Sequence, residues 1–350
     1  MAGFPGGKRE EIIDGCKIIR VGSRWSVYFK TYKYYQKHLR GWADLVIEEI
    51  NTFPFLSQFY IHPVKSPAEC GGARRGEQFN RARQKRVLIV YQLCREIWFY
   101  QIFFPMNLIG YLIEPIYLWL LRKNKVITIS ASTKNDLIKY GFRRKNIAVI
   151  PVGIKMKPIE NLDKIKKYNS FTLLSLGAIR KMKRPDHQIK AFEIAKRRIP
   201  ELKLKIAGAG YGRYYRKIIK LIANSPFKKD IEYLGRVSRD DKIELMQKSH
   251  LILVTSVKEG WGLIVTETNS QGTPAVVYNV DGLRDSVRNN ETGLVTKKNT
   301  PQYLARSIVE LAKNKKKYAR LQRAGWERSK KINFDNCYQQ FLEVINEKQT

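Results

Sequence analysis

Cysteine and histidine are scarce in this sequence, with four of each among 350 residues. The cysteines, at 16, 70, 94 and 337, form no Cys-x-x-Cys pair and lie at no zinc-ligand spacing from a histidine. No Asp-x-Asp occurs either, so there is no obvious carboxylate site for a metal-bound diphosphate. We therefore expect neither a metal nor another cofactor. Scattered cysteines and a start without the apolar core of a signal peptide favour a cytoplasmic protein.

Acidic residues are also few. The chain has 31 Asp and Glu against 66 Lys and Arg, which gives a formal net charge of +35. Basic residues are spread along the whole chain rather than gathered in a tail. Such a charge attracts nucleotide phosphates, anionic lipid surfaces and nucleic acid alike, and a solvated basic surface without a specific partner is equally compatible with it. Because no basic-and-aromatic module of the usual kinds is present, we expect no specific nucleic-acid partner.

A single apolar stretch, residues 98–121, is long enough to cross a membrane. It is interrupted by Pro105, Glu114 and Pro115, which suit two short helices with a break better than one span. A third interpretation is an apolar, aromatic surface that enters a membrane interface, with basic residues on its flank: Arg122, Lys123 and Lys125. That interpretation predicts peripheral contact with an anionic membrane on its inner face.

The pattern of apolar residues indicates an α/β protein. From residue 171 onward, short runs of Ile, Leu and Val alternate with amphipathic segments, which is typical of a parallel sheet covered by helices on both faces. The first half contains a second, less regular set of strand candidates. The expected strands are 16–21, 44–50, 86–91, 125–130, 147–152, 171–177, 202–208, 231–235, 251–256, 274–278 and 292–296, and the expected helices are 184–198, 211–223, 239–248, 262–272 and 334–345.

These elements predict two doubly wound domains. We place an N-terminal domain at 1–155, a C-terminal domain at 165–325 and a closing helix in 326–350. The crossing between the domains falls where Gly153, Pro158 and a lysine-rich stretch interrupt the pattern. Residues 65–86 are polar, basic and poor in apolar residues, so we expect a loop or insertion there.

The most informative motif is EGWGLIVTE, residues 259–267, which follows a predicted strand and begins a predicted helix. Gly260 and Gly262 let the backbone turn tightly and approach a ligand closely. The unpaired N–H groups near Gly262 and Leu263, at the positive end of the helix dipole, suit a phosphate. Glu259 and Glu267 then flank that phosphate, where they can accept hydrogen bonds from sugar hydroxyls. A nucleotide-sugar offers a sugar, a diphosphate and a ribose in that order.

Two glycine-containing loops are expected at the same edge of the sheet, because ligands of doubly wound domains bind at the carboxyl ends of the strands. The first, GAIRKMKRP, places Arg180 and Lys183 just after Gly177, where a cation can stabilise a departing diphosphate. The second, IAGAGYG, contains Gly208 and Gly210. Taken alone it is a weak motif, since glycine-rich turns are common in α/β domains.

Taken together and in this order, the motifs resemble retaining glycosyltransferases of family 4, whose GT-B fold has two Rossmann-like domains facing a cleft. The similar segments are SLGAIRKMKRPDHQIKAFEIAKRRIPELKLKIAGAG, IEYLGRVSRDDK, EGWGLIVTETNSQGTPAVVYNVDGLRDSVRNNETGLV and TISASTKNDLIKYGFRRKNIAVIPVGI. The resemblance implies that Glu259 faces the donor sugar and Glu267 the ribose. It further implies that Lys183 binds phosphate and that Val237 lies where the backbone meets the nucleobase. Gly260, Trp261, Gly262 and Leu263 would complete the donor site.

The sequence departs from the family pattern at three places. Ala178 stands where the family has an arginine after the first glycine, and Arg180 is the candidate substitute. Tyr91, in YQLCREIWFY, stands where the related subgroup has a histidine, whereas Arg95 is in place on the acceptor side. The usual opening strand, glycine-rich loop and helix are missing before DGCKIIRVG, so we expect a shortened N-terminal domain.

The resulting expectation is an enzyme that transfers a sugar from a nucleotide-sugar donor to an acceptor hydroxyl, with retained anomeric configuration and without a metal. Glu259, Lys183 and Arg180 are the expected catalytic residues. The acceptor would be a glycan, a lipid-linked molecule or a small molecule. The alternative is a shortened family member that binds a nucleotide-sugar or a partner protein without catalysis, and a different enzyme on the same fold, such as an epimerase or a phosphorylase, is a further one.

Overall fold

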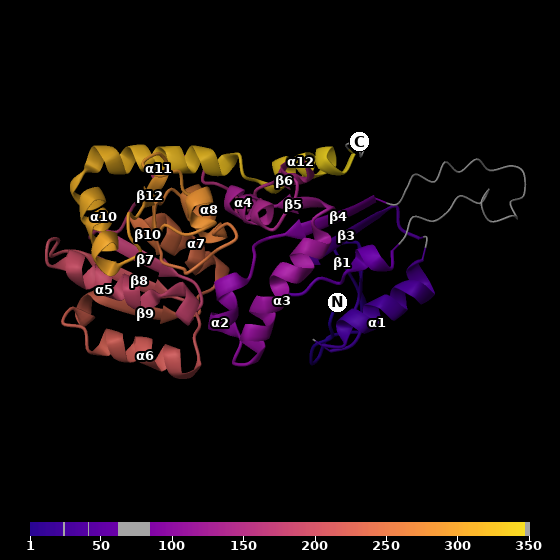
Figure 1. The fold of residues 1–350 in the computed structure, drawn as a ribbon. Coiled ribbons are helices and arrows are strands. Elements are labelled where there is room, and N and C mark those ends of the chain that lie inside the picture. The colour runs from indigo at the N-terminus through magenta and orange to yellow at the C-terminus, as the bar shows by residue number, and fades with distance from the viewer. Residues whose placement is uncertain (24, 41, 62–84, 347–350) are drawn as a thin grey trace, which may run out of the picture.

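The protein is described by a computed structural model that covers residues 1–23, 25–40, 42–61 and 85–346. Most of the predicted loop at 65–86 lies outside these described residues. The described chain forms two parallel β-sheets, each covered by helices, and a separate two-stranded hairpin (Figure 1). This is the α/β architecture with two parallel sheets that the hydrophobic pattern predicts. The six-stranded sheet is doubly wound, whereas the four strands of the other sheet lie in chain order.

The C-terminal sheet has six strands in the order β12-β11-β10-β7-β8-β9, all parallel. Its side chains alternate between two faces, so that Leu173 packs into one core and the next residue, Leu174, into another. The strands are β7 (Thr172–Leu176), β8 (Lys203–Ala207), β9 (Ile231–Gly235), β10 (Leu251–Val254), β11 (Ala275–Val277) and β12 (Gly293–Val295). The expected strands in this half are confirmed, with ends that differ by at most two residues.

Helices cover both faces of this sheet. Side chains of α5 and α10 fill the core on one face, and side chains of α7 and α8 pack on the other. The helices are α5 (Pro185–Lys196), α6 (Gly212–Ala223), α7 (Arg239–Lys248), α8 (Leu263–Ser270), α9 (Leu283–Ser286), α10 (Pro301–Lys313) and α11 (Lys315–Lys330). All ligand-binding loops predicted above therefore lie on one sheet edge, beyond the carboxyl ends of its strands.

The N-terminal sheet has four parallel strands in the order β3-β4-β5-β6. They are β3 (Leu45–Ile50), β4 (Lys85–Val90), β5 (Lys125–Thr128) and β6 (Ile147–Val149). Helices α1 (Val27–Tyr34), α2 (Trp98–Gln101), α3 (Met106–Leu121) and α4 (Ala131–Lys139) belong to this half. The predicted strand at 16–21 does not join the sheet: β2 (Cys16–Ile19) pairs in antiparallel register with β1 (Glu10–Ile13), because the reversal at Asp14 and Gly15 has positive φ at both residues.

The apolar stretch 98–121 forms two helices with a break at 102–105, as its prolines predict, but Pro115 does not break α3. A proline inside a helix frees the carbonyl four residues earlier. Here that group, the Tyr111 carbonyl, accepts a hydrogen bond of 3.1 Å from Arg95 Nη1. No helix among the described residues is long and apolar enough to cross a membrane.

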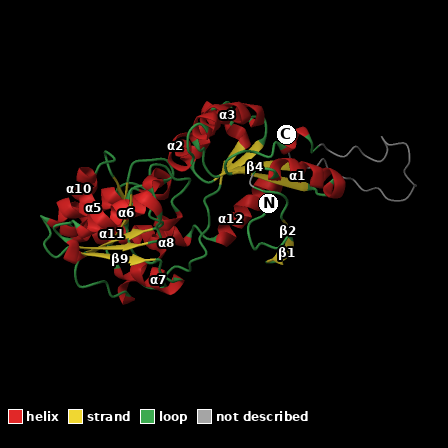
Figure 2. Ribbon diagram, turned by 90° about the horizontal axis from the view of Figure 1, so that it is seen from below, coloured by secondary structure: helices red, strands yellow, loops and turns green. Residues whose placement is uncertain are grey.

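The last helix, α12 (Phe334–Asn346), returns from the C-terminal half and covers the N-terminal sheet (Figures 1 and 2). Cys337, Phe341, Val344 and Ile345 pack there against Val87, Ile127 and Ile150 of the sheet and its edge. Lys85 Nζ also donates to the Ile345 carbonyl at 2.9 Å. The chain therefore crosses between the two halves twice.

Candidate nucleotide-sugar site

The loops after β7 and β8 touch backbone to backbone. A Cβ on Gly208 would lie 1.9 Å from the Gly177 carbonyl oxygen, and Gly208 has a φ of +153°. A Cβ on Gly210 would lie 2.7 Å from the Ile179 side chain and 2.5 Å from Tyr215. Only glycine permits these approaches. The two predicted glycine loops are therefore one structure, whose backbone can face a ligand without side chains in the way.

The basic turn that follows Gly177 is held against the end of β10. Lys181–Lys183 form a short 3₁₀ helix, and Arg184 has a positive φ of 51° just before α5. Thr255 Oγ1 donates to the carbonyls of Lys183 and Arg184 and accepts from Gln188 Nε2. This anchoring directs Lys183 toward the carboxyl ends of the strands. Arg180, in contrast, lies exposed at the start of the turn.

Glu259 and Lys183 meet directly, although 76 residues separate them. Lys183 Nζ donates to Glu259 Oε1, and Ser256 Oγ donates to the same oxygen at 2.5 Å. The loop that carries Glu259 is shaped by Gly282, where a Cβ would lie 2.2 Å from the Glu259 carbonyl oxygen. A small cavity of about 30 Å³ opens beside this pair, lined by the Gly177 loop, Lys183 and the end of β10. A carboxylate and an ammonium group thus stand together at the wall of the predicted phosphate site.

Helix α8 begins one residue after Gly262, whose φ is +86°. The first N–H groups of a helix have no partner inside it, and here they follow the Glu259 loop directly. One turn farther on, Glu267 Oε2 accepts a hydrogen bond from Lys242 Nζ at 2.6 Å. Each glutamate of the motif is therefore paired with a lysine, one on each side of the helix start. Lys242, on α7, was not selected from the sequence.

The side chains of two predicted donor residues pack against other parts of the protein. Trp261 is buried in a cluster with Ile129 and Ile332, between the two halves of the chain, and its indole N–H donates to Thr266 Oγ1 at 2.9 Å. Val237 is half-buried against the core beneath α7. Gly260 also lies at the junction, because a Cβ there would be 2.8 Å from the Tyr91 carbonyl oxygen of the N-terminal half.

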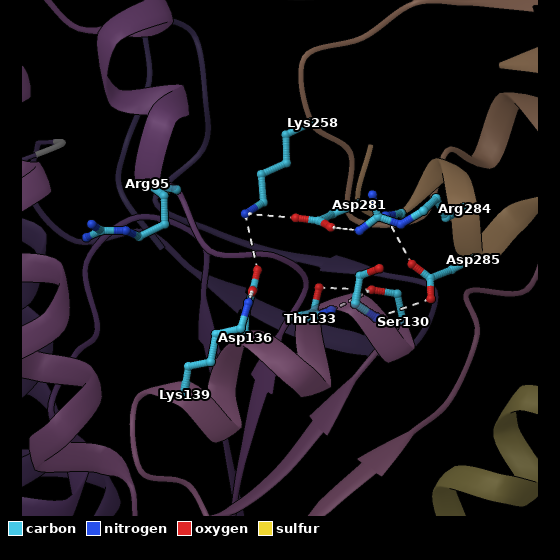
Figure 3. Close-up of polar contacts among 12 residues, drawn as sticks. Arg95, Ser130, Thr133, Asp136, Lys139, Lys258, Asp281, Arg284 and Asp285 are labelled. Atoms are coloured by element: carbon cyan, nitrogen blue, oxygen red, sulfur yellow. Dashed lines mark hydrogen bonds and ion pairs between the residues drawn. The ribbon is translucent and has the colours of Figure 1, made fainter. Parts of the chain in front are cut away.

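The side chains of the two predicted acceptor-side residues contact residues of the N-terminal half. Tyr91 donates its hydroxyl to Glu49 Oε1 at 2.9 Å, and burial together with this carboxylate raises the pKa of Tyr91 to about 12. Arg95 has a φ of +34° and stacks on the Tyr111 ring, with its guanidinium carbon 3.9 Å from the ring centre. Figure 3 shows the Arg95 side chain turned away from Lys258. Glu49 was not selected from the sequence, since nothing local distinguishes it.

Arg95 is held in this conformation by Glu114, the buried carboxylate of α3. Glu114 accepts hydrogen bonds from the N–H groups of Cys94 and Arg95, both at 2.7 Å, and from the Trp98 indole at 3.0 Å. A fully desolvated carboxylate needs such partners, and three donors satisfy it. Glu114 is therefore a structural residue that fixes the turn before α2.

An ionic cluster joins the two halves beside the site. The buried Lys258 lies 3.3 Å from Asp136 of α4 and 3.5 Å from Asp281 of the C-terminal half (Figure 3). Burial lowers the pKa of Lys258, but the carboxylates of Asp136, Asp281 and Glu96 together outweigh this and raise it overall. Ser132 N also donates to Asp285 Oδ1 across the junction at 3.1 Å. A polar cavity of about 540 Å³ opens here, with residues of both halves in its wall.

Among the described residues, no group of three or more His, Cys, Asp or Glu side chains is arranged to hold a metal ion. Cys16 is exposed rather than buried, whereas Cys94 and Cys337 are half-buried thiols. Near the glycine loops, Lys183 and Lys242 are paired with glutamates, and Arg180 is exposed. This arrangement offers cations to a phosphate and carboxylate oxygens to sugar hydroxyls.

The part of the chain that contains these loops matches a known protein family. Residues 159–328 match the family Glycosyl transferases group 1. This segment contains both glycine loops, Lys183, Glu259, Glu267 and helix α8. The match agrees with the broader family predicted from the motifs.

Individual relatives agree with this match. The poly(glycerol-phosphate) alpha-glucosyltransferase of Bacillus subtilis is 28% identical over 183 residues, which is 52% of this chain and 26% of that protein. Sucrose-phosphate synthase from Thermosynechococcus elongatus has a TM-score of 0.69 at 17% identity, over 97% of this chain and 85% of its own. An Anabaena protein solved with UDP-glucose has a TM-score of 0.60 at 18% identity, over 75% and 72% of the two chains. The fold is thus shared across both halves, and it is that of GT-B glycosyltransferases.

The alignments to curated relatives are shorter than these structural ones. The matched segments span 39%, 26% and 38% of the length of three such relatives. This chain therefore matches less than half of the length of each of these relatives.

Proposed function

We propose that the protein is a retaining glycosyltransferase that moves a sugar from a nucleotide-sugar to an acceptor hydroxyl without a metal ion. The observation that carries this proposal is the meeting of Lys183, Glu259 and the start of α8 beside two glycine loops, within the segment that matches Glycosyl transferases group 1. The relative solved with UDP-glucose supports a nucleotide-sugar as the donor.

The proposed chemistry begins with the bond between the sugar's anomeric carbon and the diphosphate. As this bond breaks, negative charge develops on the departing diphosphate, and preorganised donors stabilise it most effectively. Lys183 and the N–H groups of Leu263 and Ile264 are those donors, with Arg180 at the rim. Without a covalent intermediate, retention requires the acceptor oxygen to bond to the anomeric carbon from the face that the diphosphate leaves, and the acceptor's proton passes to the departing diphosphate oxygen. The polar cavity between the halves would admit such an acceptor.

The carboxylates take the second role. Glu259, already oriented by Ser256 and Lys183, accepts hydrogen bonds from hydroxyls of the transferred sugar. Glu267 accepts from the ribose after Lys242 shifts its contact. Lysines placed beside both carboxylates supply the positive charge that a metal would otherwise bring, which is why we propose a metal-independent reaction.

The acceptor is proposed to be a glycan or a lipid-linked molecule, and the reaction to take place in the cytoplasm at the inner membrane face. The apolar surface of α3, described below, supports a lipid-linked acceptor. Tyr91 would donate a hydrogen bond to the acceptor only if its hydrogen bond to Glu49 opened.

The test is release of nucleoside diphosphate from a panel of UDP-, GDP- and ADP-linked sugars, with and without EDTA. We expect one donor to be consumed at equal rates under both conditions, and NMR of the product to show the anomeric configuration of the donor. Loss of activity in EDTA would refute metal independence. Donor binding without release would favour the non-catalytic alternative, which the Tyr91–Glu49 bond and Ala178 also favour.

A further inference from the structure

The side of helix α3 that faces solvent is apolar, which is unusual for a helix on the surface of a protein. Its buried face, with Tyr117, Leu118 and Leu121, packs on the N-terminal sheet in the ordinary way. Its outer face should be polar in a water-exposed helix. Instead, every exposed residue between 103 and 120 is apolar. We call these residues the α3 surface, and its main members are Phe103, Phe104, Leu112, Ile113, Ile116 and Trp119.

The exposure of the α3 surface is large. Phe103 is 78% exposed and Ile116 is 59% exposed, although both are apolar. Leu112, Ile116 and Trp119 follow one another at helical spacing, so that they form one stripe. Figure 2 shows α3 on the outer edge of the molecule, on the side of the N-terminal sheet away from α12. Contiguous exposed apolar surface of this kind marks a binding surface.

The charged residues around the α3 surface indicate which kind of partner it binds. The only acidic residue between positions 97 and 135 is Glu114, which is buried and fully bonded. Basic residues gather at the carboxyl end of α3: Arg122 lies 3.8 Å from the Trp119 ring centre, and Asn146 bonds the Lys123 carbonyl. That bond brings a second basic turn beside Lys123, with exposed Arg143, Arg144 and Lys145. An apolar stripe that ends in a tryptophan and a cluster of cations fits an anionic lipid surface.

The geometry favours a helix that lies on a membrane. Helix α3 has 16 residues, fewer than the roughly 20 needed to cross the hydrocarbon layer. Its buried face is also occupied by the protein's own core. Only the outer face is available, as in a helix that lies in the interface plane.

The α3 surface is also connected to the candidate site. Gln101, at the end of α2, donates to Met182 Sδ of the basic turn at 3.2 Å. Tyr100 lies next to the same turn, with Lys181 Nζ 5.7 Å from its ring centre. The loop with Phe103 and Phe104 follows directly. A lipid held at this loop would therefore place its head group near the entrance to the donor site.

We propose that the α3 surface docks the protein on an anionic lipid membrane, with its apolar stripe among the acyl chains and the basic cluster at the head groups. Docking would bring a lipid-linked acceptor to the site, and this part of the inference rests on the proposed function. Docking itself does not depend on catalysis, so the two can be tested separately.

The experiment is flotation of the full chain with phosphatidylcholine vesicles that contain or lack phosphatidylglycerol. The variant Leu112→Glu/Ile116→Glu alters two exposed residues of the stripe. Its matched control is Ile12→Glu/Tyr338→Glu, which makes the same charge change at exposed apolar residues elsewhere. We expect wild type and control to float with anionic vesicles. The stripe variant should bind at least tenfold more weakly, because the loss of either apolar contact alone lowers the affinity for the vesicles by about tenfold.

A second variant separates charge from apolar contact. Lys123→Glu/Arg144→Glu should lower flotation with anionic vesicles, and added salt should do so for the wild type. If the stripe variant floats as well as the control, general basicity explains binding and the proposal is wrong. If the wild type floats with no vesicle, the proposal is also wrong. If, in addition, a wild-type dimer becomes a monomer in the stripe variant, the α3 surface is an interface between copies of the chain.

These outcomes are distinct from failure of the proposed function. Release of nucleoside diphosphate is measured in solution without vesicles, whereas flotation is measured without a nucleotide-sugar. Unchanged thermal unfolding of Leu112→Glu/Ile116→Glu and of Lys123→Glu/Arg144→Glu excludes misfolding as the cause of weaker binding.

Discussion

The substitution Lys183→Ala tests the central pairing of the candidate site. Lys183 donates to Glu259 at the wall of the small cavity under the Gly177 loop, and its backbone is fixed by Thr255. The substitution removes one preorganised cation without disturbing that backbone. Loss of a single such donor lowers turnover by roughly a hundredfold, which corresponds to about 2.7 kcal/mol at the transition state.

The assay is kcat/KM with the donor that the panel identifies, measured as release of nucleoside diphosphate. Lys190→Ala is the matched control, because Lys190 is an exposed lysine on α5 in the same half of the chain. It makes the same change in charge and size, and we expect it to leave kcat/KM within about threefold of wild type, since exposed charges away from the site contribute little. A similar small effect of Lys183→Ala in a folded protein would refute the assignment.

A double variant sharpens this test. Glu259→Gln alone should also lower kcat/KM by roughly a hundredfold, because the sugar loses its orienting carboxylate. Since Lys183 and Glu259 position each other, Lys183→Ala/Glu259→Gln should lose much less than the product of the single effects. A fully multiplicative loss would show that the two side chains act independently, contrary to the contact between them.

Three further predictions concern stability. Gly208→Ala should lower the free energy of unfolding by roughly 3 kcal/mol or more, because a Cβ would lie 1.9 Å from a carbonyl oxygen, whereas Gly212→Ala, with positive φ but open space, should cost about 1 kcal/mol; urea unfolding measures both. Lys258→Met should cost about 1–2 kcal/mol and increase the radius of gyration in X-ray scattering, whereas Lys139→Met, at an exposed partner of the same Asp136, should change neither. Burial, and secondly the charge of Lys167, lower the pKa of His250 to about 4. The contribution of neutral His250 to the free energy of unfolding is therefore complete above pH 6.5 and is lost as the pH falls toward 4. This loss, on the order of 2 kcal/mol, should disappear from the pH dependence of unfolding in His250→Phe, and its persistence would contradict the assignment.

The elements of the fold could be predicted from the sequence because their causes are local. Continuous Ile, Leu and Val runs indicate strands buried on both faces, and the break between α2 and α3 follows from Pro105. Two details did not follow from these patterns. Pro115 continues α3 because Arg95, twenty residues earlier, bonds the carbonyl that the proline frees. The strand at 16–19 pairs within a hairpin instead of joining the parallel sheet.

The features of the candidate site that lie within a single loop were predictable in a similar way. The glycines, the Glu259–Glu267 spacing and the basic turn at 180–184 are each adjacent in the chain, so their shared edge of the sheet follows from the order of strands and helices alone.

Only the tertiary structure decided which of these groups meet, because contacts between distant residues leave no local pattern. The pairing of Lys183 with Glu259, the burial of Trp261 between the two halves and the bridge from Lys258 to Asp136 each join residues more than 70 positions apart or on different halves. The α3 surface depends on the same kind of information. The sequence shows an apolar helix, but only packing shows which face the sheet covers and which face remains for a membrane.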